Sequence, residues 1–372
     1  MKHIAYLLAG LLPLLAGCGH KHVIEIDNPS DIDRNEIVGI QLSELQSVCG
    51  QEPVRLLAAD GKEIPYQRTY DGKMIFPVEV KASGKTSVTV EPGNPAPADT
   101  LACGAFYPER KDDLTWENDR AAYRAYGPAL QADGEHAYGY DIWTKSVTRP
   151  VVAKRYYEAL NIDKSLHKDF GDGMDTYTVG PTLGGGTAAL LDSLGNIVYP
   201  WCFSDYEILD NGPLRFTARL TYDSGETRLI SLDAGEFLNR TSVRFDSCDA
   251  PSIAPGIVVH QRNADGYTLV PGECYMAYAD PTDNPSGENG LIYVGVVAPQ
   301  ADSMYYRPFD EPQFGESVGH ILAASAYTPG SDYVYYWGSG WDKGFMPDRE
   351  TWLKYLSDFN TRLRNPLTIT IK

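Results

Sequence analysis

Residues 214–245 read LRFTARLTYDSGETRLISLDAGEFLNRTSVRF, and this segment predicts three consecutive antiparallel strands. Apolar and polar residues alternate over residues 214–222, 227–232 and 237–245. Alternation of this kind places successive side chains on opposite faces of a sheet. Asp-Ser-Gly and Asp-Ala-Gly separate the three runs and are typical of tight turns. We therefore expect this segment to form a β-meander.

Further strand-like runs, rich in β-branched and aromatic residues, occur at residues 257–260, 267–270, 291–297 and 333–337. So many predicted strands in a chain of 372 residues indicate an all-β protein with a large core, organised as a two-layer sandwich of sizeable sheets. One amphipathic helix is predicted near the C-terminus, with Asp348 as its N-cap. Its apolar stripe consists of Trp352, Tyr355, Leu356, Phe359 and Leu363. We expect this stripe to dock on the sandwich.

The N-terminal part of the chain predicts a smaller β module. Strand-like runs occur at residues 23–26, 36–40 and 86–90. A segment rich in Pro and Gly at residues 93–97 then predicts a linker. We therefore expect a small N-terminal β-sandwich module over residues 18–100, with a structural role, and a large domain over residues 101–372.

The first 17 residues have the form of a secretion signal. Lys2 supplies a positive charge, and residues 4–15 are apolar but too short to span a bilayer, which takes about 20 residues. Leu-Ala-Gly then precedes Cys18, as in a lipoprotein signal that is cleaved before a lipidated cysteine; nearby cleavage without lipidation is the alternative. We therefore expect a periplasmic protein tethered to a membrane by a lipid on Cys18. The outer membrane is favoured over exposure at the cell surface, because no acidic cluster follows the cysteine.

The overall charge is strongly negative, with 50 acidic against 32 basic residues and a formal net charge of −18. Nucleic-acid binding requires a basic surface, so this charge argues against a nucleic-acid partner. Besides Cys18 there are five cysteines, none at the C-x-x-C spacing of zinc ligands: Cys49, Cys103, Cys202, Cys248 and Cys274. They can form one or two disulfides or remain free thiols. We expect neither a metal nor another cofactor.

Residues 166–186, LHKDFGDGMDTYTVGPTLGGG, crowd polar side chains and glycines into a short segment. Asp and Gly disfavour helix and strand interiors, so residues 166–174 predict an irregular loop, followed by a short strand at residues 177–179. Such a loop beside a strand is typical of a site. His167 is its leading proton-transfer candidate, because imidazole titrates nearest to neutral pH. The three aspartates Asp169, Asp172 and Asp175 lack the EF-hand calcium pattern and are more simply a turn that hydrogen-bonds its own backbone.

A second polar cluster lies at residues 116–126, WENDRAAYRAY. Arg120 and Arg124 share a face whether this segment is a strand or a helix, so their guanidinium groups should point together. Guanidinium groups bind carboxylates and sulfates through paired donors, which suits an acidic sugar. The alternative is a buried network in which Glu117 and Asp119 pair with these arginines, because buried charges are usually paired.

Six motifs occur in order along the chain: DLTWENDR (113–120), YGP (126–128), DIW (141–143), HKDFGDGMD (167–175), VGPTLG (179–184) and GSGWDK (338–343). Together they resemble the DUF4861 family of secreted Bacteroidetes proteins, over nearly the whole mature chain. The resemblance implies a galactose-mutarotase-like β-supersandwich for the large domain and a place in the breakdown of uronate- or rhamnose-containing polysaccharides. Two residues depart from the family loop. Phe170 stands where the family usually has a second histidine and Asp172 where it has a glutamate; if that histidine is catalytic in the family, activity here is impaired or altered.

The candidate site residues come from both polar clusters and from more distant segments. The candidate catalytic residues are His167, Tyr177, Asp175 and His260, which ends a predicted strand. The candidate substrate-binding residues are Glu117, Asp119, Arg120, Arg124, Tyr126, Trp341 and Lys343. Trp201 can also stack on a sugar, although a large aromatic is more often part of a core. We expect His167, one of the two arginines, and Tyr126 or Tyr177 to line one concave sheet face, with Trp341 or Lys343 nearby.

Three classes of function remain. A lyase or dehydratase of acidic oligosaccharides would use a base such as His167 or Tyr177 to remove a carbon-bound proton while Arg120 and Arg124 hold the carboxylate. A glycoside hydrolase would need two facing carboxyl groups, about 5–5.5 Å apart for retention or about 6.5–9.5 Å for inversion. A non-catalytic carbohydrate-binding protein would need only the aromatic residues and the arginines. The combination of histidine, tyrosine and arginine favours the first class.

The lipid anchor can be tested directly. The wild-type protein should partition with membranes, whereas the C18S variant, which lacks the thiol that carries the lipid, should be found in the soluble fraction. Ultracentrifugation of cell lysates, followed by immunodetection, separates the two. Finding both proteins in the soluble fraction would contradict the lipoprotein interpretation.

Overall fold

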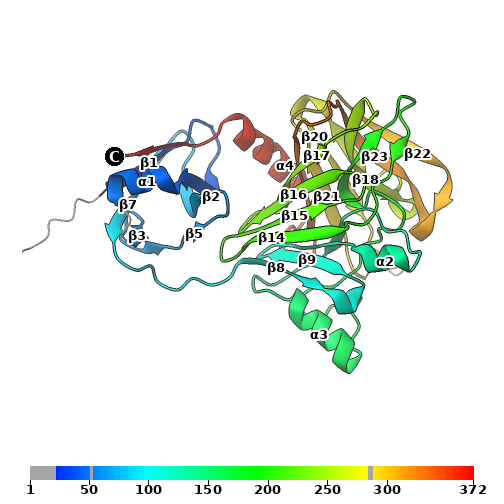
Figure 1. Cartoon of the computed structure of the whole chain (residues 1–372), viewed down its shortest axis with the longest axis horizontal. Coiled ribbons are helices and arrows are strands. Elements are labelled where there is room, and N and C mark those ends of the chain that lie inside the picture. The colour runs from blue at the N-terminus through cyan, green and yellow to red at the C-terminus, as the bar shows by residue number, and fades with distance from the viewer. Residues whose placement is uncertain (1–21, 51–52, 284–287) are drawn as a thin grey trace, which may run out of the picture.

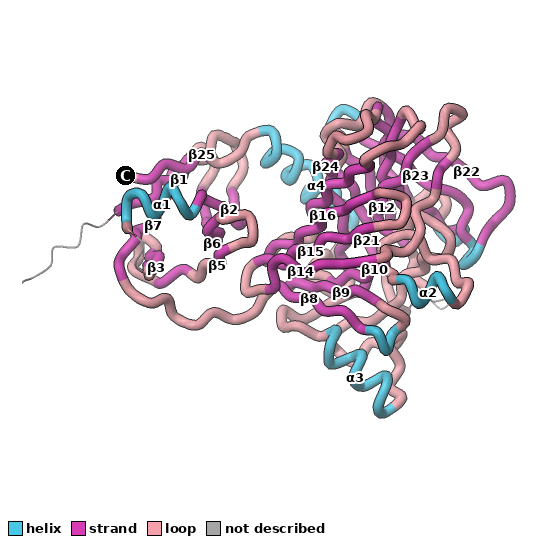
Figure 2. Tube along the Cα trace, in the orientation of Figure 1, coloured by secondary structure: helices cyan, strands magenta, loops and turns pink. Residues whose placement is uncertain are grey.

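The computed structural model describes residues 22–50, 53–283 and 288–372. Figure 1 shows a smaller body at the N-terminal end and a larger one, connected by an extended segment. Strands dominate both bodies (Figure 2). The predicted lipidation site, Cys18, lies outside the described residues, and within them no helix is long and apolar enough to cross a membrane.

The smaller body consists of two sheets and one short helix, α1 (Leu42–Cys49). One sheet has the order β25 (Thr368–Ile371), β1 (His22–Asp27), β7 (Lys85–Pro92), β3 (Val54–Leu57), β4 (Glu63–Ile64). The other has the order β2 (Arg34–Gln41), β6 (Lys73–Val80), β5 (Gln67–Arg68). Alternate residues of the strands, such as Ile24 and Ile26 in β1, are fully buried between them. This is the sandwich-like packing expected of the N-terminal module.

The edge strand β25 comes from the C-terminus of the chain. It pairs antiparallel with β1, with Ile24 opposite Ile371 and Ile26 opposite Ile369. The last residues therefore complete the smaller body, although the sequence analysis assigned them to the domain over residues 101–372. A four-residue strand such as Thr-Ile-Thr-Ile carries no information about its partner strand, which explains the difference.

The larger body contains three sheets. The eight-stranded sheet has the order β14 (Asp205–Asn211), β15 (Arg215–Thr221), β16 (Glu226–Asp233), β17 (Leu238–Phe245), β24 (Tyr333–Trp341), β21 (Ile292–Val297), β20 (Tyr275–Asp280), β19 (Tyr267–Val270). The five-stranded sheet has the order β13 (Ile197–Val198), β12 (Gly185–Leu191), β18 (Ser252–His260), β23 (Ser317–Ala326), β22 (Ser303–Gln313). The four-stranded sheet has the order β11 (Asp141–Trp143), β10 (Ala122–Ala125), β9 (Asp113–Asn118), β8 (Ala102–Tyr107). The predicted meander over residues 214–245 is confirmed, because β15, β16 and β17 pair in sequence.

The core of the larger body joins these sheets. Trp116 of β9 stacks on Phe216 of β15 with 6.1 Å between ring centroids, and Tyr140 stacks on Trp337 of β24 at 4.2 Å. Val258 of β18 is buried in the same cluster. The four- and five-stranded sheets therefore both pack on the eight-stranded sheet, and the prediction of an all-β, sandwich-like fold is confirmed.

The predicted C-terminal helix is also confirmed, as α4 (Arg349–Arg364). The carboxylate of Asp348 accepts a hydrogen bond from the backbone N–H of Thr351 at 2.7 Å, and Trp352, Leu356 and Phe359 are buried. The shorter helices α1, α2 (Pro128–Ala132) and α3 (Val152–Ile162) were not predicted. In α3 the buried face includes Arg155, and a buried arginine hides the apolar periodicity by which helices are usually found.

Two other expectations are settled by the structure. Residues 177–179 form no strand, although Tyr177 and Val179 are buried as alternation predicts; the backbone there lacks a neighbouring strand to pair with. The five described cysteines are free thiols. Burial raises the pKa of both Cys103 and Cys202 to about 11, so these two thiols stay protonated and unreactive.

Candidate functional site

A cavity of about 1200 Å³ opens in the larger body. Its wall is formed by residues from six segments: 109–113, 124–137, 167–181, 260–262, 280–283 and 314–316. Strand β10 and the ends of β18 and β20 therefore contribute to it together with the polar loop at residues 166–174. The volume exceeds the range of about 300–1,000 Å³ that is usual for small-molecule pockets, which leaves room for more than one sugar ring.

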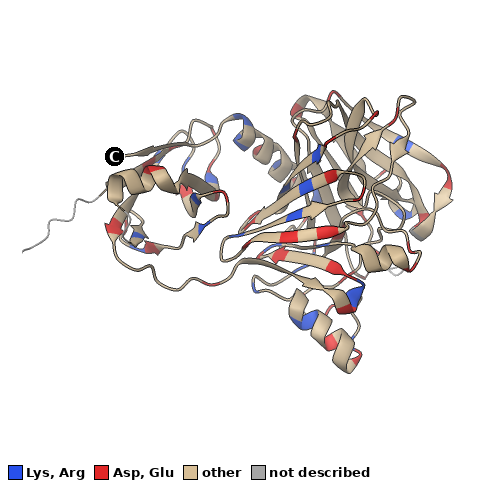
Figure 3. Cartoon of the chain, viewed as in Figure 1, with Lys and Arg blue, Asp and Glu red and all other residues tan. Residues whose placement is uncertain are grey.

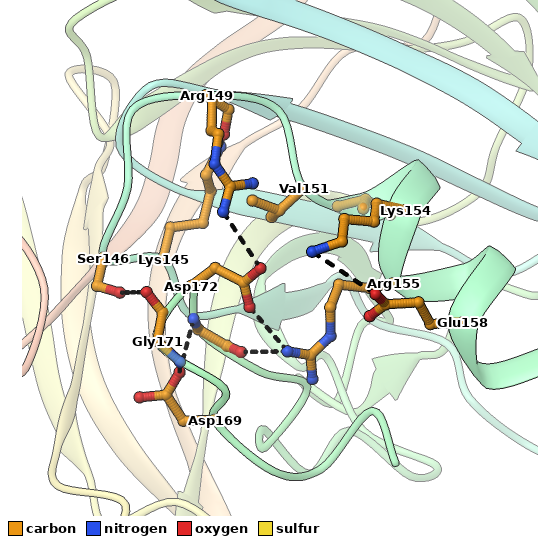
Figure 4. A network of polar contacts seen from close by, with 12 residues as sticks. Lys145, Ser146, Arg149, Val151, Lys154, Arg155, Glu158, Asp169, Gly171 and Asp172 are labelled. Carbon is orange, nitrogen blue, oxygen red and sulfur yellow. Dashed lines mark hydrogen bonds and ion pairs between the residues drawn. The ribbon is translucent and has the colours of Figure 1, made fainter. Parts of the chain in front are cut away.

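The polar loop is held by a buried arginine from α3. Arg155 donates hydrogen bonds to the carboxylate of Asp172 at 2.8 Å and to the carbonyl oxygen of Gly173 at 3.1 Å (Figure 4). It also donates to the carbonyl oxygens of Ser165, Leu166 and Lys168. One rigid guanidinium therefore satisfies five acceptors of a loop that has no regular backbone pairing of its own.

The first two aspartates of the loop have structural partners. Asp169 accepts hydrogen bonds from the N–H groups of Gly171 and Gly173, as predicted for a turn that bonds its own backbone (Figure 4). Asp172 pairs with Arg155 and, at 3.6 Å, with Arg149 (Figure 4). Asp172 is therefore a loop anchor, with both of its carboxylate oxygens in ion pairs.

Phe170 lies outside the cavity wall. Its ring is 46% exposed and is contacted by three cations, the nearest being Lys164 with its Nζ 4.4 Å from the ring centroid. A side chain at this position faces away from the cavity, and Phe170 stabilises the loop through cation–π contacts.

Arg124 of β10 lies at the centre of a carboxylate cluster. Its guanidinium contacts Asp141, Asp175 at 3.1 Å and Asp113 at 3.5 Å. Tyr126 donates a hydrogen bond to Asp141 at 3.0 Å. Because three carboxylates surround one guanidinium, the positive charge of Arg124 is already offset within the protein, as in the buried network considered in the sequence analysis but with different acidic partners.

Two carboxylates of this cluster, Asp141 and Asp113, hold protons more tightly than usual. Burial, with a smaller contribution from the neighbouring Asp175, raises the pKa of Asp141 to about 6 against the opposing effect of Arg124. Burial also raises the pKa of Asp113. Burial, together with the nearby aspartates, raises the pKa of Tyr126 well above its usual range, so its hydroxyl group remains protonated.

His260 forms a buried pair with Asp280. The Nδ1 of His260 lies 2.7 Å from Oδ2 of Asp280, and because a carboxylate can only accept, Nδ1 carries the proton. Asp280 is itself held by the N–H of Thr282 at 2.8 Å. Within the described residues the opposite ring nitrogen, Nε2, has no hydrogen-bond partner. The pair therefore presents a basic nitrogen beside the cavity that it lines.

Tyr177 is the neighbour of His260 in the cavity wall. Their ring centroids are 6.3 Å apart in an edge-to-face arrangement. Tyr177 is 6% exposed, and its hydroxyl group likewise has no hydrogen-bond partner among the described residues. Burial and the charge of Asp280 raise the pKa of Tyr177 well above its usual range. Tyr177 therefore keeps its hydroxyl proton at neutral pH, which suits a proton donor better than the base expected from the sequence.

His167 lines the cavity from the polar loop and is exposed to solvent. Its Nδ1 lies 2.8 Å from the backbone carbonyl oxygen of Asp175. A carbonyl oxygen can only accept, so Nδ1–H donates and Nε2 is left available. The structure thus brings together six of the predicted residues in one cavity: His167, Tyr177, Asp175, His260, Arg124 and Tyr126.

Three residues of the second cluster lie elsewhere. Glu117 is buried, accepts a hydrogen bond from Lys145 at 2.6 Å and binds the N–H groups of Val151 and Val152 at the start of α3. Asp119 accepts from the N–H of Gly235 and pairs with Arg120 at 3.5 Å. The prediction that Arg120 and Arg124 point together is wrong.

A chain reversal separates the two arginines. Strand β9 ends at Asn118 and β10 begins at Ala122, so Arg120 lies in the connecting turn, where it packs over the Phe345 ring. Arg124 lies on the returning strand, opposite Thr115. Arg120 and Arg124 would share a face only if they lay on one continuous strand or helix, and the turn between β9 and β10 separates them.

The two predicted sugar contacts near the C-terminus are also outside the cavity wall. Trp341 is 3% exposed and donates its indole hydrogen bond to the carbonyl oxygen of Asn289 at 2.8 Å. Lys343 donates to the backbone carbonyl oxygen of Glu288. Both side chains therefore hold residues 288–289 in place, a structural role that their positions in a motif did not reveal.

Four residues with a part in the site were not predicted from the sequence. Arg110, Asp113 and Asp280 line the cavity, and Asp141 contacts the cavity residue Arg124. Asp113 and Asp141 belong to quoted motifs, so a signal for them existed. Asp280 ends a strand and is 20 residues from its partner His260, and sequence spacing does not reveal such a pair.

The anchoring role of Arg155 predicts a large effect on stability. R155A should lower the free energy of unfolding by about 3–5 kcal/mol, because it leaves the buried Asp172 with only the more distant Arg149 as a cation partner. The matched control K154A removes an exposed neighbour on α3 whose ion pair with Glu158 contributes at most about 0.5 kcal/mol. Urea unfolding measures both. Equal stabilities for the two variants would contradict the anchoring role.

The raised pKa of Asp141 predicts a pH dependence. Because the pKa of Asp141 is higher in the folded than in the unfolded protein, its protonated form stabilises the fold. This contribution of about 3 kcal/mol is fully present below about pH 4 and is lost as the pH rises through about 6. The stability of the wild type relative to D141N should therefore fall by about this amount between pH 4 and pH 7. Urea unfolding across this range provides the test, and parallel profiles would contradict the assignment.

Comparison with known proteins adds the following findings. The sequence profile of a domain of unknown function, DUF4861, matches residues 26–369. Uncharacterized protein P7 of Formosa agariphila is 26% identical over 407 residues, with full coverage of both chains. Among solved structures, an alpha-mannosidase from Enterococcus faecalis V583 and a protein in the glycosyl hydrolase family 38 from Enterococcus faecalis each align with a TM-score of 0.43 and 8% identity.

The alignments with these two structures cover 95% of this chain, which spans about half of their length, 46% and 47% respectively. The profile match, in contrast, extends over nearly the whole sequence and includes every residue that lines the cavity. The chain therefore belongs to the DUF4861 family.

Proposed function

We propose that this protein is a carbohydrate-active lyase or dehydratase that acts on acidic oligosaccharides, with His260 as the general base. The observation that carries the proposal is the presence of two buried polar groups in the cavity wall, Nε2 of His260 and the hydroxyl group of Tyr177. Neither group has a hydrogen-bond partner within the described residues. Buried polar groups are normally satisfied, so atoms of this kind beside a cavity are suited to a substrate.

The two groups have complementary proton states. Nδ1–H of His260 is held by Asp280, which keeps Nε2 as the acceptor and stabilises the imidazolium that forms when it takes a proton. Tyr177 keeps its proton because burial raises its pKa. An elimination requires a base that removes one proton and an acid that delivers another, and both residues line the same cavity.

The reaction then proceeds as follows. Nε2 of His260 takes the proton from the sugar carbon next to the carboxylate, and the electrons of that C–H bond form a carbon–carbon double bond. The C–O bond on the adjacent carbon breaks, and its oxygen receives the proton of Tyr177. If this oxygen is glycosidic, the chain is cleaved; if it belongs to a hydroxyl group, water leaves. Transfer of the proton from His260 to the Tyr177 oxygen restores both residues.

A carbon-bound proton becomes acidic only when the charge of the adjacent carboxylate is offset. Arg110 is placed to do this. It lines the cavity, its Nε is buried without a hydrogen-bond partner, and in the described part of the chain it forms no ion pair. Two other cations of the wall, Lys111 and Arg262, are paired with Asp133 at 3.0 Å and with Glu316 at 3.4 Å. Arg110 therefore replaces Arg120 in the role that the sequence suggested.

The carboxylates of the Arg124 cluster are less suited to a glycosidase mechanism. Asp113 and Asp175 are bound by Arg124, and Asp141 is 0% exposed and does not line the cavity. His260, in contrast, keeps a free nitrogen. Proton abstraction is therefore the chemistry that the geometry supports best. A lipid anchor on Cys18 would place this activity in the periplasm, on oligosaccharides released from larger polysaccharides.

The proposal is tested by mass spectrometry of rhamnose- and uronate-containing oligosaccharides after incubation with the enzyme. The wild type should produce an unsaturated end or a loss of water. H260Q and Y177F should each lower the rate by about 10²–10⁴-fold, the usual contribution of a general acid or base. Matched controls are H22Q in the smaller body and Y157F on α3, where Tyr157 is 66% exposed; both should keep wild-type rates.

The outcome also distinguishes the other functions. Products that gain water on cleavage would show a hydrolase and contradict the proposal, as would unchanged activity of H260Q. Binding of the oligosaccharides without any change in their mass, in wild type and variants alike, would show a carbohydrate-binding protein instead.

A further inference from the structure

A group of exposed and partly exposed aromatic side chains lies next to the cavity. Trp201 is 50% exposed, and its ring centroid lies 5.8 Å from that of His136 and 5.6 Å from that of Tyr138. Tyr138 in turn lies 5.5 Å from Tyr199. We call these four residues the aromatic rim. They come from two segments, one after α2 and one after β13, so the rim is assembled by the fold and not by local sequence.

The rim is continuous with the cavity. His136 and the following Ala137 line the cavity wall, and His136 is also in ring contact with Trp201. The thiol of Cys202, next to Trp201, lies 3.8 Å from the carbonyl oxygen of Ala137, which connects the two segments at the cavity edge. A ligand that fills the cavity and extends outward along this side would therefore meet the aromatic rim next.

The chemistry of the rim matches a sugar ring. A sugar presents a face of C–H groups and an edge of hydroxyl groups. Aromatic rings provide a flat apolar surface, and Trp, Tyr and His add polar tips that can hydrogen-bond at its border. Large aromatic residues are mostly buried in folded proteins, so a half-exposed tryptophan in contact with two other aromatic rings indicates a binding surface.

We infer that the aromatic rim is a second sugar subsite, which binds a residue of the oligosaccharide beyond the one that reacts in the cavity. The protein would therefore act on oligosaccharides in preference to the smallest acidic sugars. The inference rests on the proposed function for the chemical class of the substrate, but not for the reaction. The cavity volume of about 1200 Å³ is compatible with a ligand that extends beyond one ring.

The test is calorimetric binding in the H260Q variant, which should prevent turnover. A size series of rhamnose–uronate oligosaccharides, from disaccharide to hexasaccharide, provides the probes. Affinity should rise with length in H260Q. Adding W201A should weaken binding of the hexasaccharide about tenfold, equivalent to about 1.4 kcal/mol, and leave binding of the disaccharide unchanged. Adding Y157A instead, which removes a more exposed aromatic side chain on α3, should change neither.

Each other outcome contradicts the inference in a distinguishable way. If W201A binds every length as H260Q does, the rim is no subsite, and the proposed function is unaffected. If W201A loses the disaccharide as well, Trp201 acts on the reacting sugar and not on a further one. If W201A instead converts a dimer into a monomer at unchanged affinity, the rim is a self-association surface. If H260Q binds no probe of any length, the proposed function fails, and the subsite with it.

Discussion

The buried guanidinium of Arg124 is the interaction on which the cavity depends. It joins three carboxylates that come from β9, from β11 and from the end of the polar loop: Asp113, Asp141 and Asp175. Tyr156 of α3 donates to Asp113 at 2.8 Å and so adds the helix to the same cluster. Removing one partner from such a buried network typically costs about 3–5 kcal/mol, because the remaining charges are left without compensation. The wall of the cavity is therefore fixed by electrostatics rather than by a continuous sheet.

This arrangement has a consequence for the chemistry. A cluster with more carboxylates than guanidinium groups repels an anionic ligand, and the protein as a whole has a net charge of −18. In Figure 3, basic residues are interspersed with acidic ones along the ribbon of both bodies. An acidic sugar must therefore find its counter-charge locally, and in the proposed reaction Arg110 of the cavity wall would provide it. The His260–Asp280 pair lies in the same wall, on the ends of β18 and β20, and would supply the base.

The elements with strong local signals could be predicted from the sequence. The meander follows from alternation and turn residues, and α4 follows from its cap and its apolar stripe. The polar loop was identified as part of a site because its composition excludes regular structure, and it contributes His167 and Asp175 to the cavity. In each of these cases the physical cause acts over a few neighbouring residues.

The parts that could not be predicted depend on distant partners. The buried face of α3 includes Arg155, whose partners lie in the loop that follows. The apolar periodicity of the helix is therefore interrupted by a charged residue. The turn between β9 and β10 contains neither Gly nor Pro, and for that reason Arg120 was placed beside Arg124. The pair of His260 and Asp280, and the return of β25 to β1, arise only from tertiary packing. Local sequence propensity does not predict contacts between residues that are distant in the sequence.

The central claim is that a proton is removed from the carbon next to a substrate carboxylate. Proton NMR of an acidic oligosaccharide during turnover by the wild-type enzyme observes this atom directly. The account predicts that the signal of this carbon-bound proton disappears at the same rate as a vinylic signal from the new double bond appears. Retention of that proton in a cleaved product would contradict the account, because a hydrolase leaves this C–H bond intact.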